Sequence, residues 1–337
     1  MKKVVLYFSF SVFTMASAYG QLIPNLGGQR TGISALDFLK LDVDPRADAM
    51  AGAQVSYQGD AYSANWNPAS MTDVKGVAFA TSDKVLPADV QNSYVSAMIP
   101  DKRQGCWGFT LTNMNSGAID KTTEFQPQGT GQVVYDDDFA LGVSYAKELS
   151  DMFSLGVTAK YIRQQMAEFN VNTAAIDLAF LYKTDYRDLR FAIMIQSLGP
   201  TSTLTGSFDQ TSFITQTQTT SPFSASTVFK MGFSFTPYDD GARQFRMQFQ
   251  LNHPGDNAEN IAMGMEYNYL KIVSFRAGYN FNFLDHSYPS FGIGIHSHIG
   301  RNIVMIDYAF MPTNYMGNVQ NIGISMNINK VKKDEPR

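Results

Sequence analysis

Residues 244–252 read QFRMQFQLN, a stretch in which apolar and polar side chains alternate without a break. A period of two is the side-chain repeat of an extended strand, so one face of this strand is apolar and the other is polar. The same period recurs at 261–269 (IAMGMEYNY), 275–282 (FRAGYNFN) and 321–329 (NIGISMNIN). The pattern predicts strands that separate an apolar environment from a polar one.

Segments of this kind follow one another from residue 74 to the end of the chain. Their number is even, as single-chain bacterial outer-membrane barrels require, and about ten residues at a tilt of about 40° span roughly 25 Å of apolar band. The fourteen predicted strands are 74–81, 90–99, 105–113, 139–148, 153–165, 172–183, 188–198, 226–236, 243–253, 258–269, 271–282, 291–299, 301–311 and 319–329.

Connection lengths give a second test. Counted in order, the even-numbered connections are short, as at 149–152 and 184–187, while the two longest, 114–138 and 199–225, are both odd-numbered. A barrel sorts its connections in this way, because short turns lie on the periplasmic side and long loops lie outside. Two soluble β-sandwich domains, the alternative, give no reason for this parity, and mid-strand charges such as Arg276 do not suit their shared core. We therefore expect an all-β fold, a transmembrane antiparallel β-barrel of about 14 strands.

The first twenty residues, MKKVVLYFSFSVFTMASAYG, have the form of a secretory signal peptide. Lys2 and Lys3 precede an apolar run that is too short for a membrane helix, and small residues follow it. We expect cleavage before Gln21, with the bond after Ala18 as the alternative. The expected location is the outer membrane, with both ends of the mature chain in the periplasm.

Composition and residue spacing argue against several other functions. The net charge of −4 and the scattered Lys and Arg residues give no electrostatic footprint for nucleic acid. The single cysteine, Cys106, cannot form an intramolecular disulfide. His296 and His298 share the lumen-facing side of one predicted strand, but no third ligand is spaced to complete a metal site. No Ser/His/Asp arrangement or phosphate loop can be placed, so we expect no enzyme activity, no catalytic residue, no cofactor and no metal.

Residues 21–73 precede the first predicted strand and are too long for a simple tail. We expect this segment to fold from the periplasmic side into the lumen as a plug, followed by the barrel at 74–329 and a periplasmic tail at 330–337. Its stretch DAYSANWNPASM (60–71) is aperiodic. In one interpretation, its polar side chains bond lumen groups and its Trp-Asn-Pro turn wedges the segment; in the other, Asn67 and Pro68 simply initiate a turn.

Residues 38–71, FLKLDVDPRADAMAGAQVSYQGDAYSANWNPASM, resemble the N-terminal signature of the PorV/PorQ family of outer-membrane proteins. The Trp-Asn-Pro-Ala ending is closer to PorV. Two departures are visible: the usual Met-Gly pair is Met50-Ala51 here, and Asp48 stands where a small residue is common. The resemblance implies a FadL-like barrel and a structural plug motif made of Arg46, Met50, Gly52, Asp60, Asn65, Trp66, Asn67 and Pro68.

The resemblance also implies a role in type IX secretion. Proteins similar to PorV bind the C-terminal signal domain of secreted cargo and pass it from the translocon to an attachment complex, so those proteins, the cargo and outer-membrane lipid are the expected partners. One alternative is a FadL-like channel for hydrophobic small molecules, and a more distant one is an outer-membrane lipid hydrolase. The long loops combine polar residues with aromatic side chains, as protein-binding surfaces do. The expected partner-binding residues are Phe125, Tyr135, Phe208, Phe213 and Phe223.

Overall fold

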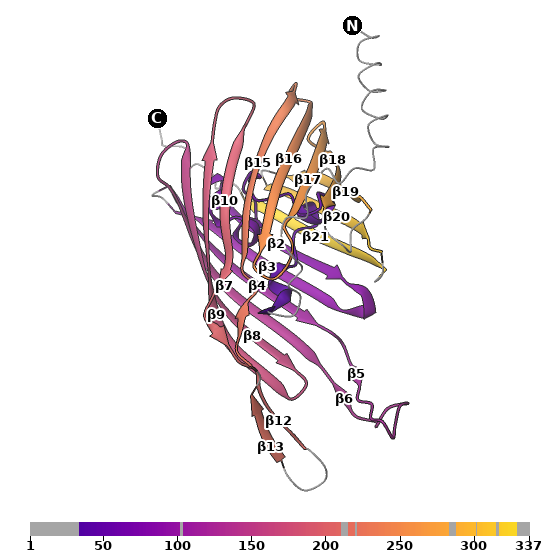
Figure 1. Ribbon diagram of the computed structural model, residues 1–337. Coiled ribbons are helices and arrows are strands. Elements are labelled where there is room, and N and C mark those ends of the chain that lie inside the picture. Colours follow the sequence, from indigo (N-terminus) through magenta and orange to yellow (C-terminus); the bar gives the residue numbers. More distant parts are fainter. Residues whose placement is uncertain are drawn as a thin grey trace.

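The structure of the chain is a computed structural model (Figure 1), which describes residues 34–101, 104–209, 215–219, 221–282, 288–300, 302–314 and 317–328. Fourteen long strands form one closed wall. They are β2 (Val77–Val85), β3 (Gln91–Pro100), β4 (Gly105–Asn115), β7 (Asp136–Glu148), β8 (Phe153–Met166), β9 (Phe169–Lys183), β10 (Arg190–Leu198), β15 (Val228–Asp239), β16 (Arg243–Pro254), β17 (Asn260–Tyr269), β18 (Val273–Phe281), β19 (Ser290–Ile299), β20 (Asn302–Pro312) and β21 (Asn318–Ile328).

Each wall strand pairs antiparallel with its neighbour in the chain, and the first strand, β2, pairs with the last, β21, to close the barrel. The predicted fold class and strand number are therefore confirmed. Closure also removes the free edges that an open sheet would expose. The one break in register within β10 lies between Ile195 and Leu198.

The two faces of the wall differ as the period of two predicts. Phe275, Phe291 and Ile322 point outward and are 51–53% exposed, whereas Glu266 and Arg276 point inward and are at most 4% exposed. Exposing an apolar belt of this extent to water would be unfavourable, whereas contact with lipid is favourable. The belt therefore indicates that lipid surrounds the wall. Within the described ranges, no helix is long and apolar enough to cross a membrane.

Two hairpins extend beyond the wall at one end of the barrel, called the hairpin end below (Figure 1). One is β5 (Ile119–Asp120) with β6 (Val133–Val134), and the other is β12 (Thr205–Asp209) with β13 (Thr215–Thr219). They lie in the two longest connections, those predicted to be extracellular. The base of the second hairpin also carries β11 (Thr201–Ser202) and β14 (Phe223–Ala225), and β14 pairs in parallel with β1 (Ser34–Ala35).

Residues 36–74, called the N-terminal segment below, lie inside the wall, where Figure 1 shows their short indigo helices. Pro45 and Pro68 each occupy the first turn of a helix, where a missing N–H costs nothing, and Asp44 and Asn67 cap those helices through their side chains. The helices are η2 (Asp37–Lys40), α2 (Pro45–Ala49), α3 (Ser63–Trp66) and η3 (Pro68–Asp73). The expected signal peptide at 1–20 and tail at 330–337 lie outside the described residues.

Candidate functional site

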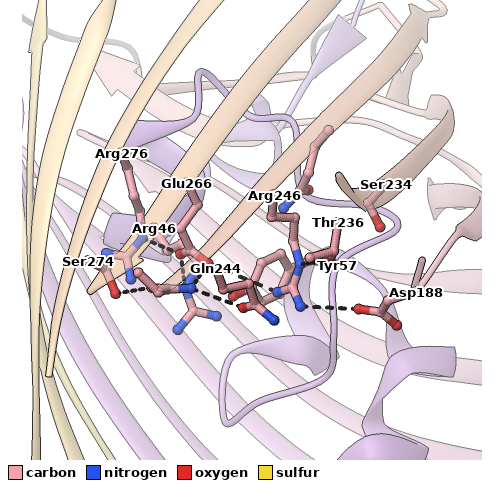
Figure 2. A network of polar contacts seen from close by, with 12 residues as sticks. Arg46, Tyr57, Asp188, Ser234, Thr236, Gln244, Arg246, Glu266, Ser274 and Arg276 are labelled. Atoms are coloured by element: carbon pink, nitrogen blue, oxygen red, sulfur yellow. Dashed lines mark hydrogen bonds and ion pairs between the residues drawn. The ribbon is translucent and has the colours of Figure 1, made fainter. Parts of the chain in front are cut away.

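A layer of charged side chains crosses the lumen, with the Glu266 carboxylate at its centre (Figure 2). Arg246 and Arg276 are the cross-strand partners of Glu266 on β16 and β18, so the sheet register alone brings the three together. Arg276 Nε donates to Glu266 at 2.6 Å, and its Nη1 donates to Asp307 on β20 at 2.6 Å. Arg246 reaches Asp188 at 3.1 Å.

The N-terminal segment supplies the remaining members of this layer. Arg46 on α2 donates to Asp60 at 2.5 Å, and its Nε lies 3.8 Å from Glu266. The Tyr57 hydroxyl donates to Glu266 at 2.9 Å. The guanidinium carbons of Arg46 and Arg246 each lie 4.7 Å from the centre of the Tyr57 ring, a cation–π distance. Charges from the segment and the wall thus form one network.

A second ionic contact holds the other side of α2. Lys84 on β2 donates to Asp48 at 2.8 Å and to the carbonyl of Asp42 at 2.7 Å, and Asn321 on β21 donates to Asp48 at 2.6 Å. Burial raises the pKa of Asp48 to about 6, and the neighbouring Lys84 opposes the rise. Asp48, a departure from the family pattern, therefore serves as a docking contact for the wall.

Wall amides and hydroxyls satisfy the backbone of the segment. Gln250 accepts from the N–H groups of Gln54 and Val55 at 2.9 and 2.8 Å, and Ser234 donates to the carbonyl of Ser56 at 2.9 Å. Glycines on the wall leave room for this contact: a Cβ on Gly278 would lie 2.2 Å from the carbonyl carbon of Met50. At this depth the N-terminal segment occupies much of the lumen. A water-filled lumen would leave room for large side chains on the polar face of the wall. Where the N-terminal segment packs against that face, we expect large substitutions to clash with it.

The residues of the predicted plug motif lie within the segment and are largely buried. Trp66 is 2% exposed and its ring meets that of Tyr57 edge-on, with centroids 6.2 Å apart. Asp60 bonds Arg46 and the Tyr62 N–H, while Asn67 donates to the Val55 carbonyl and caps η3. The side-chain bonds of Asp60 and Asn67 thus hold the segment's own turns and do not reach the wall.

The Met-Gly departure has a visible consequence. Ala51 has φ of +54°, in the left-handed region that favours glycine, and Gly52 follows with φ of +84°. These two residues follow the end of α2 and turn the chain inside the barrel. Met50, just before them, is fully buried against Gly264 and Gly278.

The predicted loop aromatics fall into different environments. Phe125, between β5 and β6, is 94% exposed, and Tyr135 is 48% exposed. Phe223, in contrast, is partly buried against the apolar cluster that contains Phe38 and Leu39. Phe208 belongs to β12, and Phe213 lies outside the described residues.

Between the segment and the wall, at the hairpin end, lies a cavity of about 370 Å³. Its floor includes Asp48 and Gly52 of the segment, and its sides come from the hairpin ends of β2 and of β15 to β21. Three acidic and three basic side chains line it: Asp37, Asp42, Asp48, Lys40, Lys84 and Lys230.

The alternation at 244–252, 261–269 and 275–282 places Arg246, Glu266 and Arg276 on the polar face of their strands, but it does not identify the groups that bind them. Tyr57 lies in the aperiodic N-terminal segment and carries no local signal beyond its polarity. Asp307 does occupy an inward position in the alternating stretch VMIDYAF, so the period of two could have identified it. His296 is on the lumen side, as predicted, and its Nε2 lies 3.1 Å from Ser274 Oγ.

Comparison with known proteins agrees with this geometry. Residues 26–188 match the family model described as type IX secretion system protein PorV. Over this stretch, just under half of its length, the chain is similar to the PorV family. It is accordingly an outer-membrane β-barrel, and the hairpin end is its extracellular end. Among curated proteins, none matches the chain in sequence.

Solved structures confirm the FadL-like fold of the barrel. The Pseudomonas putida toluene transporter TodX superposes with a TM-score of 0.58 at 12% identity, covering 85% of this chain and 97% of TodX. The Ralstonia pickettii toluene transporter TbuX gives 0.55 at 11% identity, with 84% and 96% coverage. A Pseudomonas aeruginosa FadL homologue gives 0.50 at 10% identity, with 85% and 98% coverage. At these identities the likeness concerns the fold.

Proposed function

We propose that this chain is an outer-membrane component of a type IX secretion system. Its extracellular loops bind the C-terminal signal domain of secreted cargo. The chain then docks this cargo at the translocon or attachment complex. The family match supports the secretion role. The observation that carries the cargo-binding role is the pair of hairpins projecting from a barrel whose lumen is occupied by the N-terminal segment. Such a molecule presents its free surface outward, above a rigid wall.

The composition of the hairpins fits a protein partner. Phe125 and Tyr135 stand exposed among Thr, Gln and Gly residues, and exposed aromatic side chains of this kind serve as anchors in protein interfaces. Surface loops also concentrate binding residues on scaffolds that hold them in place. We assign no enzyme activity to the chain.

The N-terminal segment acts, in this proposal, as a permanent plug. It is tied to the wall by Arg46, Asp48 and Tyr57, and moving it would leave several buried charges without partners, at a cost of several kcal/mol. The alternative is a channel for hydrophobic small molecules, in line with the toluene transporters of the same fold. It is less well supported, because the cavity beneath the hairpins is lined by six charged side chains, which are poor contacts for a hydrocarbon.

Two deletions test the proposal while preserving the wall. In the first hairpin, Asp120 and Val133 are paired, so replacing residues 121–132 by Asn-Gly closes it with a two-residue turn. In the second, Ser202 pairs with Phe223, and residues 203–222 can be replaced in the same way. We expect the double deletion to abolish co-purification of secreted proteins that carry C-terminal signal domains from gently solubilised membranes.

A matched control changes the opposite end of the barrel by replacing the turn at 240–242 with Gly-Ser-Gly. It should retain the cargo. All variants should run faster on a denaturing gel unboiled than boiled, as an intact barrel does. Full cargo recovery with the double deletion would remove both hairpins from the binding site and favour the channel.

A further inference from the structure

Lys230 contributes to the extracellular cavity an ammonium group that forms no ion pair with any residue the structure describes. Lys230, on β15, is 8% exposed and lines the cavity. Among the described residues, none makes a hydrogen bond or ion pair with its side chain. Its neighbour Lys160 is satisfied by Asp177 at 2.7 Å. The Asp42 and Asp177 carboxylates act on Lys230 from a distance, but neither forms an ion pair with it, so its ammonium group can still accept a directly bound anion.

The other lysines of the cavity are already paired. Lys84 binds Asp48 at 2.8 Å, and Lys40 binds Asp37 at 2.9 Å and Asp256 at 2.8 Å. Once these pairs are set aside, one cation and one anion of the lining remain without an ion-pair partner among the described residues.

That anion is Asp42, half-buried in the N-terminal segment. No described residue within 4.0 Å forms an ion pair with its carboxylate, although its backbone carbonyl accepts from Lys84. The six charges of the lining sum to zero, so a ligand of zero net charge preserves the balance. A ligand that carries both a carboxylate and an ammonium would satisfy Lys230 and Asp42 together.

The remaining lining suits a peptide-like molecule. Gln250 donates to Asn252, and Asn252 donates to Asn260, each at 2.7 Å, which leaves the NH₂ group of Asn260 at the end of the chain of amides. Met311 and Val319, cross-strand neighbours on β20 and β21, add an apolar patch. Amides match peptide groups, the patch fits an apolar side chain, and the volume of about 370 Å³ is within the range of small-molecule sites.

We propose that this cavity is a binding site for a small zwitterion, an α-amino acid or dipeptide with an apolar side chain, whose carboxylate pairs with Lys230 and whose ammonium pairs with Asp42. This site is separate from the cargo-binding hairpins. It can be measured on the purified full-length mature protein in detergent, without any other secretion component.

The test is calorimetric titration with the dipeptide Ala-Leu and two blocked forms of it. Loss of one charge-assisted hydrogen bond should weaken binding roughly ten- to hundredfold. Wild-type protein should therefore bind Ala-Leu more tightly than N-acetyl-Ala-Leu or Ala-Leu amide by this factor. Lys230→Met should weaken Ala-Leu but leave the amide unaffected, and Asp42→Asn should weaken Ala-Leu but leave the N-acetyl form unaffected.

A matched control and a stability measurement separate binding from folding. Lys121→Met removes an exposed lysine in the first hairpin and should bind Ala-Leu as the wild type does. Lys230→Met should melt at the same or a higher temperature, because it removes an unpaired buried charge. A large drop in its melting temperature would show that Lys230 is structural and would overturn its assignment to a ligand.

Three results would overturn the proposal. The first is absence of Ala-Leu binding to the wild type, and the second is equal binding of the free and blocked dipeptides, a comparison that needs no variant. The third is tighter binding of octanoate or of glycerophosphoethanolamine than of Ala-Leu. That result would assign the cavity to a simple carboxylate or to a lipid headgroup.

Discussion

Arg46→Met should loosen the N-terminal segment without opening the barrel. The substitution keeps most of the buried side-chain volume but removes the guanidinium that bonds Asp60, approaches Glu266 and stacks on Tyr57. Breaking a buried pair by removing one partner costs about 3–5 kcal/mol. Glu266 retains Arg276, so most of this cost falls on the contacts within the segment.

The single cysteine reports the effect directly. Cys106 is 1% exposed and packs in the apolar cluster that includes Tyr57, Trp66 and Met71 of the segment. A maleimide can reach it when the segment opens locally, so the labelling rate follows the free energy of opening. A loss of about 3–5 kcal/mol corresponds to an increase of roughly two to four orders of magnitude.

The pH dependence has a defined sign. Burial raises the pKa of Asp60 in the folded chain, and Arg46 opposes that rise, so the pKa of Asp60 should rise further in the variant. A carboxyl with a raised folded pKa destabilises the fold when ionised, and this penalty disappears as the pH falls toward the unfolded pKa. The labelling ratio of variant to wild type should therefore be larger at pH 8 than at pH 5.

Arg163→Met, which changes an exposed arginine on β8, is the control and should label like the wild type. A ratio near one for Arg46→Met at pH 8, in a protein that still shows the mobility shift of an intact barrel, would refute the ionic docking of the segment.

Three further substitutions probe the wall and the segment. Gln250→Ala should leave the N–H groups of Gln54 and Val55 unpaired, and each unpaired group should cost about 1–3 kcal/mol. Cys106 labelling should then rise at least tenfold. Unchanged labelling would mean that water replaces the amide. Trp66→Ala should cost about 3–5 kcal/mol and expose the segment to limited proteolysis, and a cleavage pattern like that of the wild type would contradict its packing role. Phe249→Arg, on the lipid face, should lower the free energy of unfolding in lipid by about 2–4 kcal/mol and leave Cys106 labelling unchanged. Faster labelling of Cys106 would show that Phe249 affects the lumen.

The wall could be predicted from sequence because its signal is local. Alternation along each strand reports which side chains meet lipid, and all fourteen predicted segments overlap wall strands. The approach of Arg46 to Glu266 could not be predicted, because Glu266 lies over 200 residues away and Arg46 reaches it only when α2 docks inside the closed wall. Lys160 and Lys230 illustrate the same limit. Both are inward-facing lysines in alternating strands, and only the three-dimensional arrangement shows that Asp177 pairs with the first.

Photo-crosslinking from the first hairpin tests the proposed cargo binding most directly. A photoreactive phenylalanine at Phe125, which is 94% exposed at the extracellular end, is compared with one at Tyr186, which is 71% exposed in a turn at the opposite end. The account predicts crosslinks from position 125 to the C-terminal domains of secreted proteins and none to them from position 186. Crosslinks to these domains from neither position, or equally from both, would contradict the account.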